Sequence, residues 1–434
     1  MSGIKIAFIS LGCSKNQVDS EKILGMLDLK YQLTNNYNEA EMIFINTCAF
    51  IEDAKREAID TILEMIEYKT KGKCKNLVVL GCLIERYEKE IIKEIPEIDL
   101  VIPISNYSQL KKILTNELHI DVICDYGLKR WICENNNSAY LKIADGCDNK
   151  CSYCAIPLIR KDYRSTPIDE LINEAKELVS KGVKEIVLIA QDTTNYGYDL
   201  YGYYALADLL KSLNEIEGLF WIRVLYMYPA LLSKELIVDM SELSKVLFYF
   251  DLPLQHGSER LLKLMNRRGT IADFKNKIEF IKSFKKPYVL RTTMMVGFPK
   301  EKEEDFSDLL ELVRESRFHK LGAFIYSKEE DTVAYNLKEE VDKDTAESRY
   351  NQLMDLQREI SYLRNKELVG QVLEVLIEGK ENLVYRGRSL YQSPEGIDGW
   401  IWINNKESIK IGEFYQVLIT DFDDYDLFGE FISN

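Results

Sequence analysis

The sequence is short of positive charge, of histidine and of long apolar runs. Its 56 Lys and Arg face 71 Asp and Glu, and the net charge of −15 excludes a broad basic surface for sequence-independent nucleic-acid binding. A basic partner is favoured instead. No run reaches the roughly 18 apolar residues of a membrane span, and the N-terminus passes into a strand pattern without a signal peptide. We therefore expect a cytoplasmic protein with no membrane segment.

The length and the cysteine content bound the architecture. The 434 residues suffice for about three domains. Nine cysteines, an odd number with several in tight clusters, favour metal ligation in a reducing compartment over a disulfide framework. Three of them, Cys74, Cys124 and Cys133, lack the strand-end positions that the other six share, and we interpret these three as structural thiols.

Three cysteines, Cys147, Cys151 and Cys154, follow an alternating strand that begins at Tyr140. Their spacing, Cys-x-x-x-Cys-x-x-Cys, lets three thiolates bind one cubane iron–sulfur cluster while one iron is left without a cysteine ligand. The chain has only 3 histidines, and none lies near the triplet to complete a Cys3His zinc site. The alternatives are a zinc knuckle that lacks one visible ligand and three buried thiols.

Three apolar strands in the first third of the chain each end at a cysteine, namely Cys13, Cys48 and Cys82. Their separations of 35 and 34 residues (48−13 and 82−48) match strand–helix–strand units. Strands this apolar are typical of a parallel sheet covered on both faces, in which ligand sites form beyond the carboxyl ends of the strands. We therefore expect these thiols to converge as a second three-cysteine cluster, although cysteine is also a common buried residue.

The middle of the chain alternates apolar strands with amphipathic helices. This alternation predicts a parallel sheet that curves into a partial barrel of six strand–helix units, with functional residues at the carboxyl ends of the strands. Gln191 and Asp192 follow the second strand. His256 follows the fourth, and we interpret it as a structural histidine and not as a base. The first strand begins at residue 140, and the other five span residues 184–190, 220–227, 246–252, 287–296 and 320–326.

The spacing of apolar residues in the last part of the chain changes after a charged helical stretch between Asp342 and Lys366. Short strands with glycine-rich turns then predict a small antiparallel barrel. Residues 366–434 carry 6 Lys and Arg against 13 Asp and Glu, a net charge of −7. Phosphate contacts need cationic side chains, so this charge favours a basic protein over a nucleic acid as the partner of the barrel.

Several motifs together resemble the radical S-adenosylmethionine (SAM) methylthiotransferases, over essentially the whole chain. Within that family the sequence is most similar to the branch that modifies a ribosomal protein. Ser14 and Lys300 depart from the proline and the glycine that the family usually has, which bears on local loop conformation and not on ligation. The motifs are Leu11–Glu21, Asn46–Ile51, Cys151–Pro157, Tyr163–Ser165, Ala190–Thr194, Pro253–His256 and Gly322–Ser327.

The resemblance implies three domains and three cofactors. The domains are an N-terminal methylthiotransferase domain (1–133), a radical SAM core with a connecting helix (139–365) and an OB-like TRAM barrel (366–434). The cofactors are SAM and two [4Fe–4S] clusters, and no side chain is assigned as a catalytic acid or base. The implied ligands of the SAM-binding cluster are Cys147, Cys151 and Cys154, those of the auxiliary cluster are Cys13, Cys48 and Cys82, and the implied SAM contacts are Tyr153, Gln191 and Asp192.

The activity implied by the resemblance is methylthiolation of the β-carbon of an aspartate in the small-subunit ribosomal protein uS12. Reductive cleavage of SAM would give the 5′-deoxyadenosyl radical. The auxiliary cluster would supply the sulfur, and a second SAM would supply the methyl group. A reducing protein such as a flavodoxin would supply electrons. The nearest alternative is methylthiolation of a transfer RNA adenosine, which the acidic last domain disfavours. Two further alternatives are a two-cluster electron carrier and a structural zinc protein that binds RNA.

Overall fold

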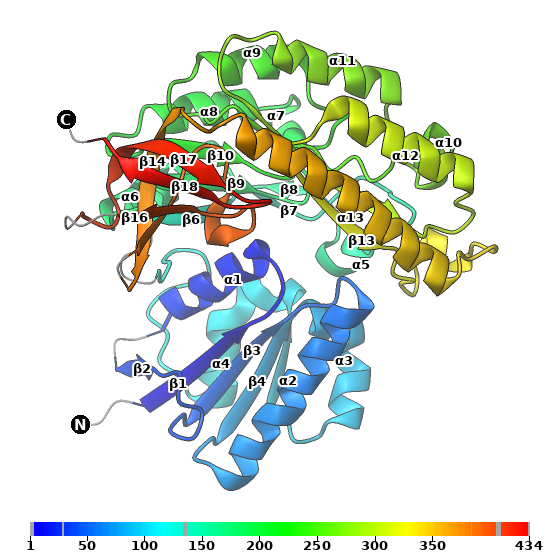
Figure 1. The fold of residues 1–434 in the computed structure, drawn as a ribbon. Coiled ribbons are helices and arrows are strands. Elements are labelled where there is room, and N and C mark those ends of the chain that lie inside the picture. Colours follow the sequence, from blue (N-terminus) through cyan, green and yellow to red (C-terminus); the bar gives the residue numbers. More distant parts are fainter. Residues whose placement is uncertain (1–3, 28–29, 133–136, 383, 405–408, 433–434) are drawn as a thin grey trace.

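The computed structural model describes residues 4–27, 30–132, 137–382, 384–404 and 409–432. Cys133, interpreted above as a structural thiol, lies outside the described residues. Among the described residues, no helix is long and apolar enough to cross a membrane. Figure 1 shows three parts: the N-terminal domain in blue, an arc of strands and helices from cyan to yellow, and a C-terminal barrel in orange and red.

The N-terminal domain is a parallel five-stranded sheet with strand order β2-β1-β3-β4-β5, as the apolar strands predict. The short β2 was not predicted. The strands are β1 (Ile4–Ser10), β2 (Tyr31–Leu33), β3 (Met42–Thr47), β4 (Asn76–Gly81) and β5 (Leu100–Pro103). The helices are α1 (Ser14–Gly25), α2 (Glu52–Lys71), α3 (Cys82–Glu94) and α4 (Leu110–Leu118).

Helices cover both faces of this sheet, because successive side chains of a strand point to opposite sides. In β3, Ile43 and Ile45 pack toward α2 and α3, whereas Phe44 packs toward α1 and α4. All three side chains are fully buried. Because β1, β3 and β4 are neighbouring parallel strands, their carboxyl ends lie side by side at one edge of the domain.

The central domain contains six parallel strands in two sheets, β10-β9-β6 and β11-β12-β13, joined by a bridge between Ile222 and Val246. This confirms the predicted partial barrel. The short antiparallel pair β7 (Ala144–Asp145) and β8 (Arg164–Ser165) was not predicted. The barrel strands are β6 (Ser138–Lys142), β9 (Glu185–Ile189), β10 (Trp221–Val224), β11 (Tyr249–Asp251), β12 (Val289–Val296) and β13 (Lys320–Ile325).

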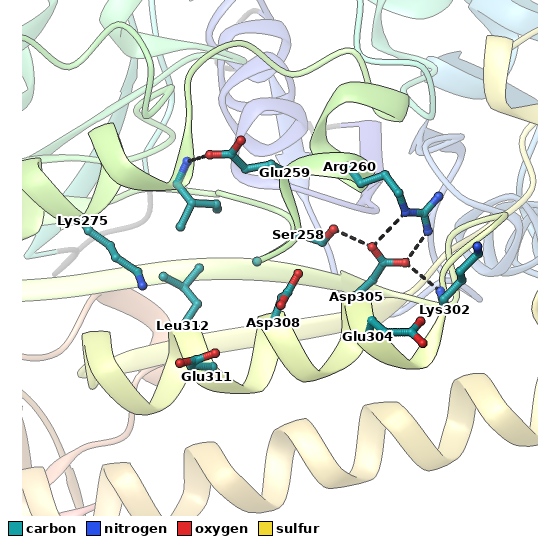
Figure 2. A pocket seen from close by; sticks show the side chains of 12 residues that line it. Ser258, Glu259, Arg260, Lys275, Lys302, Glu304, Asp305, Asp308, Glu311 and Leu312 are labelled. Atoms are coloured by element: carbon teal, nitrogen blue, oxygen red, sulfur yellow. Dashed lines mark hydrogen bonds and ion pairs between the residues drawn. The ribbon is translucent and has the colours of Figure 1, made fainter.

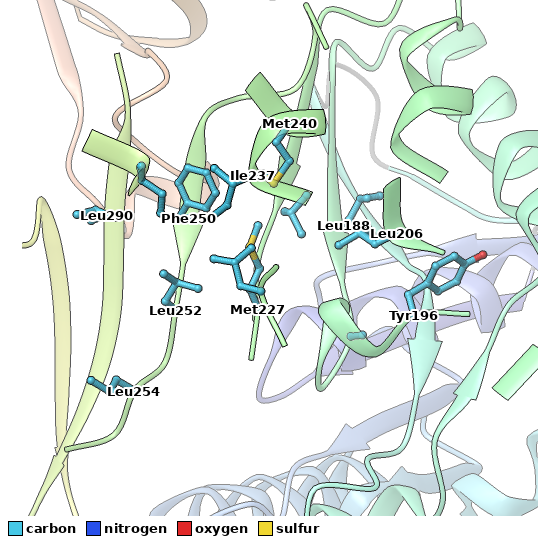
Figure 3. Packing of buried hydrophobic residues seen from close by; sticks show 14 of the residues in the cluster. Leu188, Tyr196, Leu206, Met227, Ile237, Met240, Phe250, Leu252, Leu254 and Leu290 are labelled. Atoms are coloured by element: carbon cyan, nitrogen blue, oxygen red, sulfur yellow. The ribbon is translucent and has the colours of Figure 1, made fainter. Parts of the chain in front are cut away.

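The outward side chains of the strands pack against a ring of helices. Leu188 of β9, Phe250 of β11 and Leu290 of β12 belong to this core together with Leu206 and Ile237 of the helices, as Figure 3 shows. Apolar burial on this scale is the main force that holds the arc together. The helices are α5 (Ile156–Arg160), α6 (Ile168–Ser180), α7 (Tyr198–Tyr201), α8 (Leu206–Asn214), α9 (Lys234–Glu242), α10 (Glu259–Leu264), α11 (Ile271–Lys282) and α12 (Glu303–Ser316).

The inward side chains of the same strands meet the other two domains, because a partial barrel cannot fill its own interior. Val187 and Tyr249 pack there with Val18 of α1 and with Leu376 and Phe414 of the C-terminal barrel. Helix α13 (Lys343–Lys366), the predicted connecting helix, runs along the arc to reach that barrel. The three domains therefore share one interior.

The C-terminal domain is a closed five-stranded barrel with strand order β14-β15-β16-β18-β17. Four strand pairs are antiparallel and only β16 and β18 are parallel, which confirms the predicted small antiparallel barrel. A ring with an odd number of strands cannot alternate direction all the way round, which makes one parallel pair unavoidable. The strands are β14 (Val372–Glu381), β15 (Val384–Arg388), β16 (Ile401–Asn404), β17 (Phe414–Phe422) and β18 (Leu427–Phe431).

Buried ion pairs fix this barrel against the central domain. Glu185 at the start of β9 accepts from Arg388 Nη2 at 2.6 Å and from Arg223 Nε at 2.7 Å, and all three side chains are fully buried. Tyr249 donates to Asp398 at 2.7 Å nearby. Unpaired buried charges are costly, so these contacts hold the C-terminal barrel in one position.

Candidate metal centre

Six cysteines line one cavity of about 440 Å³ between the N-terminal and central domains. They are the six that the sequence singles out, three from each domain. The two triplets thus meet across a single space, although they are far apart in the sequence. The cavity cysteines are Cys13, Cys48, Cys82, Cys147, Cys151 and Cys154.

The N-terminal triplet sits at the carboxyl ends of three adjacent strands. Cys13 caps α1 after β1, Cys48 directly follows β3, and Cys82 opens α3 after β4. Gly12 has a φ of 88°, and a Cβ at this position would lie 2.9 Å from the Cys48 sulfur. Only glycine therefore lets the β1 turn approach this thiol so closely.

The second triplet lies in the loop between β7 and α5, which is held from two sides. The Cys147 amide donates to the carbonyl of Lys161 at 3.2 Å, and the Cys154 amide donates to the carbonyl of Cys151 at 3.1 Å. Ser152, between two of the cysteines, donates from Oγ to the carbonyl of Leu264 at 2.9 Å. The short turn places three sulfurs on one side of the loop, facing the cavity.

The thiols of the cavity are electrostatically coupled within each triplet. Burial raises the pKa of Cys82 to about 12, and the neighbouring Cys48 and Cys13 add to this rise while Arg160 opposes it. Burial likewise raises the pKa of Cys154 to about 12, and Cys151 and Cys147 add to it. Such thiols are neutral at neutral pH without a metal, so metal binding has to displace their protons.

Cys13 differs from the other cavity thiols. Burial raises the pKa of its thiol, but the Lys15 ammonium, backbone N–H groups and the Arg160 guanidinium together bring it below its usual value. A thiolate is the form that binds metal. Cys13 is therefore the thiol of the N-terminal triplet best prepared for ligation.

The donor set fits iron–sulfur clusters. All six cavity cysteines are free thiols. No group of three or more His, Cys, Asp or Glu side chains in the described part of the chain converges tightly enough for a single metal ion. A four-iron cluster binds each thiolate at a different iron, so its cysteines stay apart around the cluster. Each triplet supplies three of the four thiolates that an ordinary ferredoxin site uses.

Arg160 connects the two triplets. It ends α5, six residues after Cys154, and its Nη2 lies 3.7 Å from the sulfur of Cys82. The same guanidinium donates to Asn16 Oδ1 at 2.7 Å and to Asp19 Oδ2 at 2.8 Å, both on α1. Only 3% of Arg160 is exposed. No sequence pattern indicates a role for this residue, because the contact exists only once the domains have docked.

Tyr153 lines the cavity between Cys151 and Cys154 in sequence and is held by Arg267. Arg267 Nη1 lies 3.3 Å from the Tyr153 hydroxyl and 3.7 Å from the sulfur of Cys151. Its guanidinium also stacks on the Tyr228 ring, at 4.5 Å from the centroid. Arg267 follows α10, in a loop whose pattern carried no functional signal, and it supplies positive charge beside the second triplet.

Two glutamines offer acceptors to the cavity. In the described part of the chain, the side-chain oxygens of Gln191 and Gln255 are buried and have no hydrogen-bond partner, and both residues line the cavity. Gln255 also has a φ of 81°, and the cavity residue Tyr226 has a φ of 58°. Left-handed backbone at non-glycine residues is costly and gathers at functional sites. Unpaired buried acceptors suit a polar ligand such as SAM.

Asp192 does not line the cavity and lies behind Asn149. The Asn149 amide donates to Asp192 Oδ2 at 2.7 Å, and Asn149 itself lines the cavity. The other carboxylate oxygen of Asp192 accepts from Thr194 Oγ1 at 2.5 Å. Burial raises the pKa of Asp192, and these donors oppose the rise. Of the three predicted SAM contacts, the structure thus brings Tyr153 and Gln191 to the cavity but not Asp192.

The remaining sequence candidates stand apart from the cavity. His256 is fully buried, and its Nδ1 accepts from the amide of Ser258 at 3.0 Å, which agrees with a structural histidine. Cys74 is buried in the core of the N-terminal domain, and Cys124 packs at its opposite face. Neither thiol lines the cavity, as expected for structural residues.

A second hollow of about 560 Å³ lies between α10, α11 and α12 and holds no cysteine. Figure 2 shows its charged lining. Asp305 accepts from Ser258 Oγ at 2.6 Å and from the amide of Lys302 at 2.8 Å, which caps α12. These contacts are structural, and the hollow carries no chemistry comparable to that of the cysteine cavity.

Family models match three successive stretches of the chain. A family described as uncharacterized protein family UPF0004 matches residues 5–103, the radical SAM superfamily matches residues 141–313, and the TRAM domain matches residues 369–432. The first stretch contains the N-terminal cysteine triplet, and the second contains the other triplet. All six cavity cysteines therefore fall within matched stretches.

Two curated relatives cover nearly the full length. A relative from Acetivibrio thermocellus is 44% identical, and the match covers 99% of this chain and 98% of the relative. A relative from Caldicellulosiruptor saccharolyticus is 46% identical, and the match covers 99% of this chain and 100% of the relative. Both are named ribosomal protein uS12 methylthiotransferase RimO. A solved radical SAM methyltransferase, TsrM from Kitasatospora setae, aligns with a TM-score of 0.55 at 10% identity, covering 74% of this chain and 75% of that one. That likeness concerns the fold alone.

Proposed function

This chain belongs to the radical SAM methylthiotransferases that act on ribosomal protein uS12, the RimO family, and from that premise we propose how its residues perform the reaction. It is a radical SAM enzyme that uses two [4Fe–4S] clusters and SAM. The proposal assigns Cys147, Cys151 and Cys154 to the SAM-binding cluster. It assigns Cys13, Cys48 and Cys82 to the auxiliary cluster.

A single observation carries this proposal, namely that both triplets line the same cavity. An electron carrier needs fully ligated clusters near its surface, whereas each triplet here leaves one coordination position without a cysteine. A shared cavity lets a carbon centre and a sulfur donor meet without leaving the protein. The arrangement therefore supports transfer chemistry between the two sites.

The cofactors supply a radical able to remove hydrogen from an unactivated carbon, together with the sulfur that replaces it, which no side chain can do. The protein binds and orients the cofactors and shields the reactive centre from water. Phe324, Met227 and Ile159 form apolar walls of the cavity, which limit the access of water to a reactive centre. Arg160 and Arg267 hold positive charge beside the ligand thiolates and stabilise their negative charge.

We assign the orientation of SAM to Gln191, Gln255 and Tyr153, which reach the cavity. The two unpaired glutamine oxygens accept hydrogen bonds from the amino group of the ligand. The Tyr153 ring, fixed by Arg267, offers a surface for the adenine. Asp192 acts as a positioning residue, because it holds Asn149 at the cavity wall.

The substrate is uS12. The electron donor of the enzyme is proposed to be a flavodoxin-like reducing protein. Transfer RNA is proposed not to bind, because the C-terminal barrel carries −7 and lacks the cations that phosphates need. A ribosomal substrate further suggests a cytoplasmic enzyme. The proposed domains are 1–133, 139–365 and 366–434.

Anaerobic purification tests the cofactor assignment. The protein should show the brown colour and broad absorption of iron–sulfur clusters, carry iron for two four-iron clusters per chain, and release 5′-deoxyadenosine from SAM when reduced. A colourless protein that contains zinc, or one that contains iron but leaves SAM intact, would contradict the proposal.

A further inference from the structure

Four tyrosines form an exposed aromatic surface just after β9. Tyr198 is 54% exposed, Tyr201 40%, Tyr203 51% and Tyr204 49%. The rings of Tyr198 and Tyr204 stack at 5.1 Å, and those of Tyr201 and Tyr203 lie 6.1 Å apart. Contiguous exposed aromatic rings mark interaction surfaces more often than ordinary solvent-exposed positions do. We call these four residues the tyrosine platform.

The tyrosine platform is rigid. Asp199 accepts from the amide of Ser165 at 2.8 Å and from its hydroxyl at 2.6 Å, which ties α7 to β8. The fully buried Tyr196 donates to the carbonyl of Thr166 at 2.7 Å. The Tyr201 hydroxyl accepts from the amide of Ile168 at 3.1 Å. A segment held in this way loses little backbone entropy when the platform meets a partner.

The platform belongs to the segment that follows β9 and the cavity residue Gln191. Tyr198 comes seven residues after Gln191, in α7. Ser165, which holds α7, comes two residues after Tyr163, and the Tyr163 hydroxyl donates to the carbonyl of Asp192 at 2.8 Å. These contacts join the platform to the segment that carries Asp192.

The segment that carries the platform is acidic. Residues 193–210 contain two acidic residues, Asp199 and Asp208, and no Lys or Arg. The Tyr203 hydroxyl donates to Asp208 at 2.8 Å, which directs that ring. Aromatic rings bind bases as well as cations, but a nucleic acid also needs cations for its phosphates. Tyrosine faces beside carboxylates fit Lys and Arg side chains.

We propose that the tyrosine platform docks a Lys- and Arg-rich segment of the protein substrate. The proposal rests on the proposed function and deepens it, because it names a surface for the same substrate outside the acidic C-terminal barrel. Tyr198 and Tyr204 are the most suitable probes, because their stacked rings stand clear of the hydrogen bonds that hold α7.

The test measures binding of purified uS12 to the cluster-loaded enzyme. A Tyr198→Ser/Tyr204→Ser variant should weaken binding about 5- to 30-fold, the sum expected for two exposed cation–π contacts. The KM for uS12 should rise, while kcat and the release of 5′-deoxyadenosine without substrate stay unchanged. Tyr198→Phe/Tyr204→Phe should bind like the parent chain, because the ring and not the hydroxyl makes the contact. Tyr362→Ser, at another 44% exposed tyrosine whose ring lies 4.8 Å from that of Phe422, should have no effect.

A charge variant tests the nature of the partner. Tyr204→Lys should weaken uS12 binding more than Tyr204→Ser does, because the new cation repels a basic segment. Equal or tighter binding of uS12 by Tyr204→Lys would overturn the proposal. So would loss of transfer RNA binding, with uS12 binding intact, in the double serine variant. If the parent chain modifies uS12 and the double serine variant binds uS12 as well as the parent chain does, the docking proposal is wrong but the proposed function stands. If the parent chain does not modify uS12, the proposed function is wrong as well.

Discussion

The guanidinium of Arg160 lies 3.7 Å from the sulfur of Cys82, and the two residues belong to different domains. Arg160 follows the triplet proposed to bind the SAM cluster in sequence, whereas Cys82 belongs to the N-terminal triplet. The side chain thus links the domain of one proposed cluster site to a cysteine of the other. It is also paired with Asp19 and Asp145, at 2.8 and 3.0 Å.

Replacing Arg160 should therefore affect both stability and cluster electronics. Arg160→Met leaves Asp19 and Asp145 with Lys142 as their remaining cation, and we expect the free energy of unfolding to fall by about 3 kcal/mol. The reduction potential of the auxiliary cluster should become more negative, because an N–H donor near a ligand sulfur is lost. Denaturant unfolding and a redox titration measure the two effects.

Arg160→Lys provides the matched control. It keeps the positive charge near the two carboxylates but loses the planar fork that reaches both Asn16 and Cys82. It should retain most of the stability and still lower the potential. An unchanged potential in both variants would show that Arg160 has no influence on the auxiliary site.

Removal of the N-terminal triplet should separate the two cluster sites. A Cys13→Ala/Cys48→Ala/Cys82→Ala variant should keep about half of the iron and still cleave SAM, because its SAM-binding triplet is intact. It should form no methylthiolated product. Cys74→Ala, which removes a buried thiol outside the cavity, should keep all of the iron. A folded triple variant that no longer cleaves SAM would contradict the division of roles.

Lys300 occupies a backbone conformation that suits glycine. Its φ is 70°, and its amide donates to the carbonyl of Glu339 at 2.8 Å, so the turn is fixed in this form. Lys300→Gly should raise the free energy of unfolding by about 0.5–1 kcal/mol, since relief of the left-handed strain exceeds the added freedom of the unfolded chain. Lys300→Ala keeps the strain and should give no gain. Thermal unfolding of the three proteins decides between these outcomes.

Glu185 should make docking of the C-terminal barrel sensitive to acid. Burial raises the pKa of this carboxyl, but Arg388 and Arg223 outweigh it and hold the pKa at about 2. A pKa below the unfolded value of about 4.3 stabilises the fold above that pH, and the stabilisation is lost as pH falls toward 2. We expect a loss of about 3 kcal/mol over this range.

The comparison that isolates this group uses Glu185→Gln in cluster-free protein. The difference in unfolding free energy between the parent chain and the variant should be largest above pH 5 and should shrink toward pH 3. A difference that stays constant over this range would mean that the pKa of Glu185 is the same in the folded and the unfolded protein.

Much of the fold followed from the sequence, because its signals are local. The recurrence of strands that end in Cys13, Cys48 and Cys82 predicted the parallel sheet, and alternating apolar runs predicted the six barrel strands. The convergence of the two triplets could not be predicted, because it depends on how α1 and the C-terminal barrel fill the interior of the partial barrel. Sequence spacing carries no information on that docking.

The side-chain arrangement at the site could not be predicted for the same reason. Gln191 and Asp192 are neighbours at a strand end, and only the backbone path shows that Gln191 reaches the cavity while Asp192 supports Asn149. Arg267 reaches Cys151 from a loop more than a hundred residues away in sequence. Contacts of this kind arise from tertiary packing and leave no periodic pattern.

The most direct test of the account gives the reduced, cluster-loaded enzyme both purified uS12 and transfer RNA, with SAM, and weighs the products by mass spectrometry. The account predicts a mass gain of one methylthio group on a single aspartate of uS12 and none on the transfer RNA. Methylthiolation of a transfer RNA adenosine with uS12 unmodified would contradict it.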